Sequence, residues 1–555
     1  MGSKASPLVR FALFYYISDM ARMFPIGMQS FSVIRENNAI YVDKTGLVYK
    51  LVKEGKVYFL ARPRRFGKSL LISTLDCYLS GRKELFAGLA IDKLETEWKK
   101  HPVLRFDFRK MKYMNPGMLD ELINLSLAEY EKVYGKGIDE NSPSSRLNGL
   151  ILRAEQKTGQ KVVFLVDEYD APLLDTLVDK NAFDQMRQKL RDFYSPLKSL
   201  DDHLKFIFIT GITKFSLNVI PASERESLFP VTLLNNLKII SMVDDYAALC
   251  GITEEEIRTQ MKPEIEVMAQ ATGKTFEQVC AGLKRKYDGY HFSKKSPDVY
   301  NPFSLINALQ DKDLTNYWFE TGTPTYLMDW ICKFGIDPEL LKNGIAASAD
   351  DFNVPTEGNG SPVPVLYQSG YLTIKGYDES QFLPYTLAYP NEEVAEGFTK
   401  GLLKYFSGKD SMAYNAVANT IINGFNSGDV ASVMDAIKVY LSDIPYDAAK
   451  RDELLYSTLI FGVFRIATPF LVHCEQKSAG GRADIVLETK TAVYVIEFKL
   501  DGSIEDALAQ IDSRGYLDPY RLHKTEQDLP KKLYKVAVNI DSKKRNIGDW
   551  KMVDG

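Results

Sequence analysis

Short apolar runs alternate with amphipathic stretches along the first 240 residues. Four of these runs read as buried strands: residues 57–61, 103–108, 162–166 and 206–210. The intervening segments leave room for crossover helices, with helical periodicity at 118–134 and 145–157. Strands buried on both faces of a parallel sheet are continuously apolar in this way. The pattern therefore predicts an α/β domain with a doubly wound parallel sheet.

Helical periodicity dominates after residue 240, notably at 253–269, 275–287 and 391–441. Turn-rich breaks interrupt it at 293–302 and 353–364, and the second break, rich in Gly, Pro and Ser, is the best linker candidate. A last α/β unit follows from residue 451. Its predicted elements are strands 483–487 and 492–498, helix 503–515 and strand 532–539.

This pattern divides the chain into successive regions. They are a leader (1–22), a nucleotide-binding domain (23–240), a helical lid or connector (241–352), a linker (353–364), a mixed and then helical connector (365–450) and a final domain (451–545). The apolar stretch 8–17 of the leader is too short to span a bilayer, and 18–22 lacks a clean small-residue cleavage site. We expect the folded part to open at Met23.

Composition narrows the possibilities only slightly. A chain of 555 residues with 45% hydrophobic and 26% charged content is an ordinary globular protein of two to four domains. Its net charge of -4 provides no overall attraction to nucleic acid, so such binding would need a local basic patch. The five cysteines form no CxxC pair, which argues against a zinc site or disulfide framework and favours reduced thiols in the cytoplasm.

A phosphate-binding loop follows the first apolar run. It reads Arg62-Pro63-Arg64-Arg65-Phe66-Gly67-Lys68-Ser69. Its end supplies, in order, free backbone N–H groups, a lysine for the β- and γ-phosphates and a hydroxyl for Mg²⁺. The usual pattern has glycine where this chain has Arg62.

Acidic and hydroxyl residues end the third and fourth predicted strands. Asp167 would coordinate Mg²⁺ through water or Ser69, and Glu168 would polarise the attacking water. Thr210, with Thr213 and Lys214, ends the fourth strand, where P-loop ATPases place a polar residue that senses the γ-phosphate. A hydroxyl-rich turn without such a role is the alternative.

These segments together predict an ATP or GTP site. Its expected nucleotide-binding residues are Arg64, Arg65, Phe66, Gly67, Lys68, Ser69, Leu70, Asp167 and Thr210. The two arginines could reach phosphate oxygens or form surface ion pairs, and the sequence leaves both open.

A second candidate site lies in the last unit. Glu497 and Lys499 are two residues apart on a strand and therefore share a face. If a turn brings Asp484 alongside, Asp484 and Glu497 form an oxygen site for Mg²⁺, and Lys499 can activate a water for phosphodiester cleavage. A cross-strand ion pair on an amphipathic hairpin is the alternative.

Flanking helices add polar groups to this site. Glu453 could complete the metal shell. Gln510 and Arg514 are spaced i, i+4 and precede Tyr516, so they could touch a nucleic-acid backbone or steady Lys499.

With both sites in view, the chain resembles the bacterial family that pairs an AAA-ATPase-like domain with a C-terminal PD-(D/E)xK nuclease-like domain, from Phe24 to about Asn539. The segments that carry the resemblance are Phe24-Pro25-Ile26-Gly27, Tyr41-Val42-Asp43-Lys44-Thr45, the loop at 62–69, Val166-Asp167-Glu168-Tyr169-Asp170, Thr210-Gly211-Ile212-Thr213-Lys214-Phe215, Tyr287-Asp288-Gly289-Tyr290, Tyr300-Asn301-Pro302, GRADIVL (481–487) and VIEFKL (495–500).

The resemblance implies a P-loop NTPase domain, a helical middle region and a restriction-endonuclease-like α/β domain. It implies the roles given above for Lys68, Ser69, Asp167, Glu168, Asp484, Glu497 and Lys499, and it makes Arg62 part of the family's own loop. Residues 216–233 depart from the family pattern, which leaves any finger or sensor role for Arg225 open.

Two functions follow as expectations. The first is an ATPase that uses ATP and Mg²⁺ and gates metal-dependent cleavage of DNA or RNA. The alternative is an ATP-dependent switch or remodelling protein whose C-terminal domain binds nucleic acid or a partner without cutting. We expect a cytoplasmic protein with no membrane partner. It could form a homo-oligomer, because AAA-type sites commonly need a neighbour's arginine.

Overall fold

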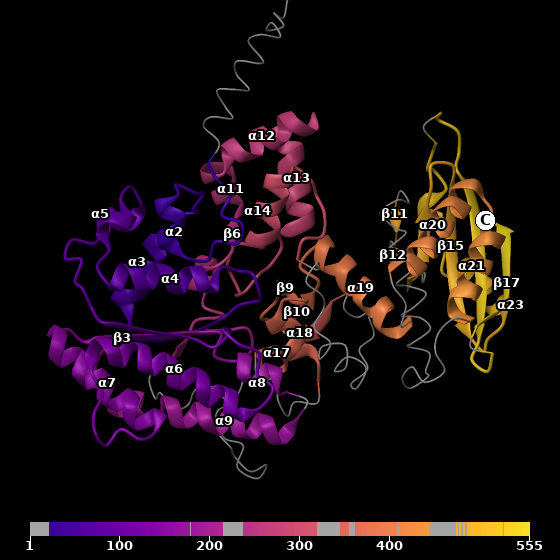
Figure 1. Cartoon of the computed structure of the whole chain (residues 1–555). Helices are drawn as coiled ribbons and strands as arrows, with labels where there is room; N and C mark the ends of the chain where they lie inside the picture. Colours follow the sequence, from indigo (N-terminus) through magenta and orange to yellow (C-terminus); the bar gives the residue numbers. More distant parts are fainter. Residues whose placement is uncertain are drawn as a thin grey trace, which may run out of the picture. The chain divides into compact units, whose positions relative to one another are not determined.

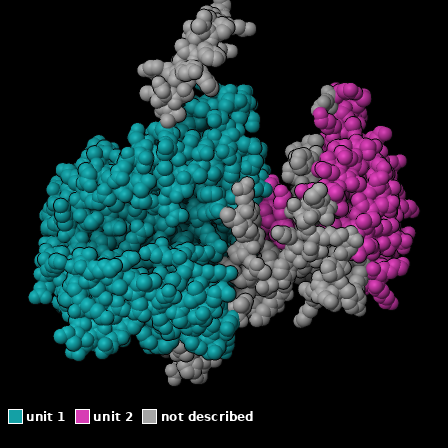
Figure 2. Space-filling view, viewed as in Figure 1, with its two compact units in different colours: residues 1–321, 339–394 teal, residues 322–338, 395–555 magenta. Residues whose placement is uncertain are grey.

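The computed structural model contains two compact units, which we describe separately (Figure 2). The first comprises the described residues up to 394, and the second those from 395 onwards. The structure describes residues 22–177, 179–214, 237–318, 344–353, 361–407, 411–442, 473–474, 477–478, 481–482, 485–525, 527–544 and 546–555.

A five-stranded parallel sheet organises the first unit. Its strands are β1 (Val57–Ala61), β2 (Val103–Asp107), β3 (Val162–Asp167), β4 (Leu204–Gly211) and β5 (Lys238–Ile239), in the order β2-β3-β4-β1-β5. The four apolar runs thus form the predicted strands. Only β5 escaped prediction, because two residues carry no periodicity. Since β4 lies between β1 and β3, the ends of these three strands meet at one edge of the sheet.

Helices cover both faces of this sheet (Figure 1). On one side lie α6 (Pro116–Tyr134), α7 (Pro143–Thr158) and α9 (Lys180–Tyr194), and on the other α2 (Phe31–Glu36), α3 (Thr45–Glu54), α4 (Lys68–Leu79) and α5 (Ala90–Leu94). Short helices α8 (Ala171–Asp175) and α10 (Pro196–Ser199) complete the layer. Helices α6 and α7 begin slightly earlier than predicted, each with a proline after a capping Asn115 or Ser142. The doubly wound α/β prediction is confirmed.

A helical region follows the sheet. It contains α11 (Glu254–Gln260), α12 (Lys262–Thr272), α13 (Phe276–Tyr287) and α14 (Pro302–Asp311), with a short strand pair β6 (Ile252–Thr253) and β7 (Val299–Tyr300). The prediction of a single helix at 253–269 is wrong, because two helices, α11 and α12, occupy this range. The helical run breaks at Met261, because Pro263 has no backbone N–H to continue a helix and starts a new one.

A small antiparallel sheet that the sequence did not reveal ends the first unit. Its strands are β8 (Ile345–Ala347), β10 (Tyr385–Ala388) and β9 (Thr373–Tyr377), in that order, with α17 (Ala349–Phe352) and α18 (Val363–Ser369). Residues 354–360 of the predicted linker lie outside the described residues. Helix α19 (Glu392–Ser407) leads into the second unit.

The second unit is a sheet with helices on both faces. Strands β11 (His473–Cys474), β14 (Ile485–Glu488), β15 (Ala492–Leu500), β16 (Lys532–Asp541) and β17 (Asn546–Asp554) pair in this order, and only β15 and β16 are parallel. A two-stranded ribbon, β12 (Lys477–Ser478) and β13 (Gly481–Arg482), accompanies it. Strand β17 extends the sheet beyond residue 545, where the sequence placed the end of the domain.

Alternation along β15 divides the core of this unit. Tyr494 and Ile496 pack with α20 (Ser411–Ser427) and α21 (Val430–Ser442), whereas Val493 and Val495 pack with Ile511 of α23 (Ile504–Ser513). The face that carries Val495 also carries Glu497 and Lys499. The alternation therefore directs the candidate catalytic side chains towards α23.

Among the described helices, none combines the length and apolarity needed to cross a membrane.

Candidate functional site

Two left-handed residues shape the phosphate-binding loop. Gly67 has φ +87° and caps the N-terminus of α4, and Arg65 has φ +66°. Glycine adopts such a conformation without steric cost. The loop thereby presents the first backbone N–H groups of α4, which have no partner within the helix and attract anions.

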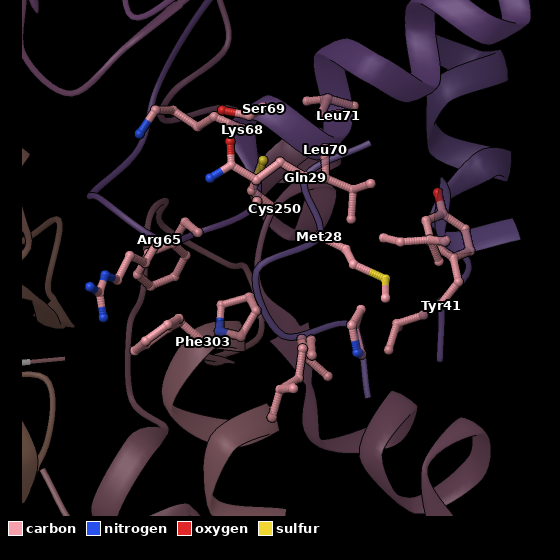
Figure 3. Close-up of a pocket in the computed structure, with 18 of the residues that line it drawn as sticks. Met28, Gln29, Tyr41, Arg65, Lys68, Ser69, Leu70, Leu71, Cys250 and Phe303 are labelled. Carbon is pink, nitrogen blue, oxygen red and sulfur yellow. The ribbon is translucent and has the colours of Figure 1, made fainter. Parts of the chain in front are cut away.

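The loop borders a cavity of about 460 Å³. Residues 65–71 and Glu168 form the side suited to phosphate, and mostly apolar side chains line the remainder, among them Ile26, Met28, Tyr41, Met261, Pro302, Phe303 and Ile306. In Figure 3, Arg65 and Tyr41 lie on opposite sides of the cavity. A polar side and an apolar side match the triphosphate and the base of a nucleotide.

Lys68 is buried, with 3% of its surface exposed. Its Nζ donates to the carbonyl oxygens of Arg62 and Pro63, both at 3.1 Å, and lies 3.2 Å from Oε1 of Glu168. The ammonium is thus held by two neutral carbonyl oxygens and one carboxylate oxygen.

Asp167 connects the third strand to the loop. Its carboxylate accepts hydrogen bonds from the hydroxyls of Thr210, at 2.9 Å, and Ser69. Burial raises the pKa of Asp167, and the hydrogen bond from Ser69 opposes that rise. A carboxylate beside a hydroxyl at the phosphate side fits Mg²⁺, which prefers hard oxygen ligands.

Asp170 fixes the edge where β3 and β4 end. Its fully buried Oδ2 accepts from the backbone N–H groups of Ile212 (2.9 Å) and Thr213 (2.7 Å) and from the Thr213 hydroxyl (2.8 Å). Burial, followed by the nearby charge of Glu168, raises the pKa of Asp170 to about 6. A Cβ on Gly211 would lie 2.6 Å from Oδ1 of Asp170, so this approach requires glycine.

The loop arginines have different surroundings. Arg62 is buried and donates to the carbonyl of Ser241 at 2.8 Å, with its guanidinium 4.1 Å from the ring centre of Phe292. It ties the loop to the chain beyond β5, which explains the absence of glycine there. Arg65 lines the cavity and lies 3.7 Å from the ring centre of Phe303. Arg64 is not among the lining residues.

Two other predicted residues, Phe66 and Lys214, are buried by contacts with neighbouring side chains. Phe66 is buried edge-on against Tyr290, with ring centres 4.7 Å apart, although it also borders the cavity. Lys214 is buried, hydrogen bonds to the side chain of Asn353, and its backbone N–H donates to Gln368 at 2.6 Å. Burial, reinforced by the charge of Arg62, lowers the pKa of Lys214 to about 7.

In the second unit, Gln510 brings the strand residues together. Its side chain donates to Oε1 of Glu497 and accepts from Nζ of Lys499, which lies 3.4 Å from the same oxygen. Glu497 is 2% exposed. A carboxylate, a lysine and an orienting amide therefore share the face between β15 and α23.

Other predicted members of this site are only partly described. Asp484 and Glu453 lie outside the described residues, and Ile485, which follows Asp484 in the chain, pairs with Ile496 next to Glu497. Tyr516 is buried in the core beneath α23. Across the described ranges, no three His, Cys, Asp or Glu side chains are grouped as a metal site.

Sequence reasoning assigned no role to the apolar side of the cavity. Several of its residues come from segments 24–27, 41–45 and 300–302, which carried the family resemblance, and others, such as Met28, Met261 and Phe303, lie outside them. These three segments carried the family resemblance although they contain no phosphate-binding chemistry. That combination was the signal from which a role in the cavity could have been predicted.

Comparisons with known proteins identify two domain families along the chain. Residues 25–221 match a family model described as predicted AAA-ATPase, and residues 451–550 match one for the PD-(D/E)XK nuclease superfamily. An Azotobacter chroococcum mcd 1 protein, described as an uncharacterized protein in vnfD 5'region, is 33% identical over 511 residues, covering 90% of this chain and 94% of its own.

A solved structure of the Aeropyrum pernix ORC1 protein in complex with DNA aligns over 63% of this chain and 90% of that chain, with 8% identity and a TM-score of 0.24, too low to support an argument. The two family models and the Azotobacter relative are sufficient to assign the family. The chain belongs to the family in which a predicted AAA-ATPase domain is followed by a C-terminal PD-(D/E)XK nuclease superfamily domain.

Proposed function

We propose that the first unit binds and hydrolyses ATP with Mg²⁺, and that its nucleotide state controls metal-dependent cleavage of nucleic acid by the second unit. The observation that supports this proposal most directly is that Lys68, Ser69 and Glu168 line a cavity of about 460 Å³, while Asp167 lies behind them and accepts a hydrogen bond from Ser69. Two of these residues come from the loop and two from the neighbouring strand end. Each supplies a different requirement of phosphoryl transfer.

The chain's own groups would act in sequence on ATP. The N-terminal amides of α4 and the ammonium of Lys68 would bind the β- and γ-phosphates. To do so, Lys68 would leave its ion pair with Glu168 and contact phosphate oxygens instead. Ser69 and Asp167 would hold Mg²⁺, which neutralises phosphate charge when bound. Glu168 then orients a water and accepts its proton.

The second unit would cleave phosphodiester bonds on the face towards α23. Glu497 and Asp484 would hold Mg²⁺, which activates a water for attack on phosphorus. Lys499 would orient that water, and Gln510 would fix the position of its ammonium. The support is the contact among Glu497, Lys499 and Gln510.

Incubation of the full chain with labelled single- and double-stranded DNA and RNA tests this function. Each substrate is combined with Mg²⁺ or Mn²⁺, with and without ATP, and Lys499→Ala is the paired variant. We expect cleavage by the wild type and none by the variant. Unchanged cleavage by Lys499→Ala contradicts the site, and retention in gel shifts without cleavage in either metal assigns the domain to binding alone.

A further inference from the structure

The segment that follows β2 lies at the same edge of the sheet as the acidic strand end. In the parallel pairing of β2 and β3, Asp107 is opposite Asp167. Carboxyl ends of adjacent parallel strands open onto the same crevice. Accordingly, Asp107 and Arg109 line the cavity together with Lys68 and Glu168. Neither residue belongs to the nucleotide-binding set expected from the sequence.

The backbone around Arg109 is anchored on both sides. Its N–H donates to Oδ1 of Asp107 at 2.9 Å. Beyond it, the Tyr113 N–H donates to Asp175 at 3.1 Å, and the buried Tyr113 hydroxyl donates to the carbonyl of Phe108 at 2.8 Å. The arginine therefore projects from a fixed position, while its side chain is exposed.

The other cations that line this cavity already have partners. Lys44 forms a 2.6 Å ion pair with Glu256, and Lys68 contacts Glu168. Arg65 lies on the ring of Phe303. Arg109, in contrast, forms no side-chain hydrogen bond or ion pair within the described residues. Its guanidinium is the lining cation whose charge is still available to a ligand.

We propose that Arg109 is a catalytic residue that contacts the γ-phosphate of ATP bound to its own chain. The inference rests on the proposed ATPase function. During hydrolysis the water oxygen bonds to the γ-phosphorus, the bond to the β–γ bridging oxygen breaks, and ADP leaves with that electron pair. The water proton passes to Glu168. The planar guanidinium donates to the γ-phosphate oxygens as their charge redistributes.

Arg109→Ala, Arg109→Lys and the control Lys110→Ala test the role. Lys110 is an exposed neighbour that does not line the cavity. A guanidinium of this kind contributes roughly 10³-fold or more to turnover. We therefore expect kcat to fall by at least about 10³-fold in Arg109→Ala, with ATP and ADP affinity within about threefold of wild type. Arg109→Lys should recover little, because an ammonium cannot donate bidentately.

The outcomes separate this inference from the proposed function. Wild-type turnover in Arg109→Ala, with an active wild type, overturns the arginine role alone. A wild type that binds ATP without turnover overturns both. Unchanged ADP binding and thermal unfolding of Arg109→Ala show that its fold is intact.

Mixing Arg109→Ala with Glu168→Gln tests whether the arginine serves its own chain. If it does, every active site in the mixture lacks one group, and turnover stays at the level of the separate variants. Recovery of turnover on mixing would show that Arg109 reaches a neighbouring chain, which contradicts the proposal.

Discussion

Lys68 and Glu168 carry opposite charges, with Nζ of Lys68 3.2 Å from Oε1 of Glu168. In the proposed mechanism each serves a different step: Lys68 contacts phosphate in the ground state and the transition state, whereas Glu168 is needed only when water attacks. Their substitutions should therefore separate binding from chemistry.

Lys68→Ala should lose ATP binding, and Glu168→Gln should bind ATP with near wild-type affinity but fail to hydrolyse it. Equilibrium binding of a fluorescent ATP analogue and phosphate release distinguish the two. Phosphate release by Glu168→Gln at the wild-type rate would refute the assigned role of that acid.

Lys214 predicts a pH dependence of stability. Its folded pKa of about 7 is below the ordinary value of 10.5, so between these values the unfolded chain binds more protons. The free energy of unfolding should therefore rise with pH across this window. As pH falls towards 7, protonation of Lys214 in the unfolded chain progressively lowers it. In Lys214→Met the rise from pH 7 to pH 9.5 should be smaller by on the order of 3 kcal/mol. Denaturant unfolding of both proteins at pH 7 and pH 9.5 measures this difference. The same change in unfolding free energy in wild type and Lys214→Met would contradict the lowered pKa.

At the scale of elements, the contact between the ends of β3 and β4 permits little change. A Cβ on Gly211 would approach Asp170 Oδ1 at 2.6 Å and the buried ring of Tyr169 at 2.7 Å. Gly211→Ala should therefore destabilise the first unit by about 1–3 kcal/mol and lower ATP turnover.

Gly46→Ala in α3 is the matched control, because its Cβ would meet Ala90 at an ordinary 3.7 Å. Thermal unfolding compares the two variants. Equal unfolding temperatures would contradict this prediction, because they would mean that the ends of β3 and β4 move apart to admit the methyl group without loss of stability.

Helix α23 positions the nuclease-like site through one side chain. Gln510→Ala removes the amide that joins Glu497 and Lys499. Orienting groups of this kind affect activity about 10–100-fold, so cleavage should fall by that factor while the fold is retained. Glu505→Ala, an exposed change on the same helix, should have no effect. Cleavage by Gln510→Ala at the wild-type rate would assign the amide a structural role only.

Much of the whole molecule could be predicted from its sequence. Buried strands β1 to β4 are continuous apolar runs, and phosphate chemistry requires contiguous residues such as Gly67, Lys68 and Ser69. Strands β8 to β10 and β17 were missed. Strands β8 to β10 have only three to five residues each, and β17 alternates buried and exposed residues so weakly that its sequence carries little periodicity.

The candidate sites divide in the same way. Arg109 carries no motif, and only the register of β2 on β3 places it at the cavity. Arg62, a departure from the usual loop, proved to be a packing residue whose partner, Ser241, lies far along the chain. Local chemistry was readable, whereas long-range contacts depended on the fold.

We propose above that nucleotide binding at Lys68 governs cleavage by the second unit. The most direct measurement is the rate at which the full chain cleaves a labelled nucleic acid with Mg²⁺, with and without ATP, in wild type and Lys68→Ala. We expect the wild-type rate to change on addition of ATP and the variant rate to stay the same. A wild-type rate indifferent to ATP, or an equal response in Lys68→Ala, would contradict it.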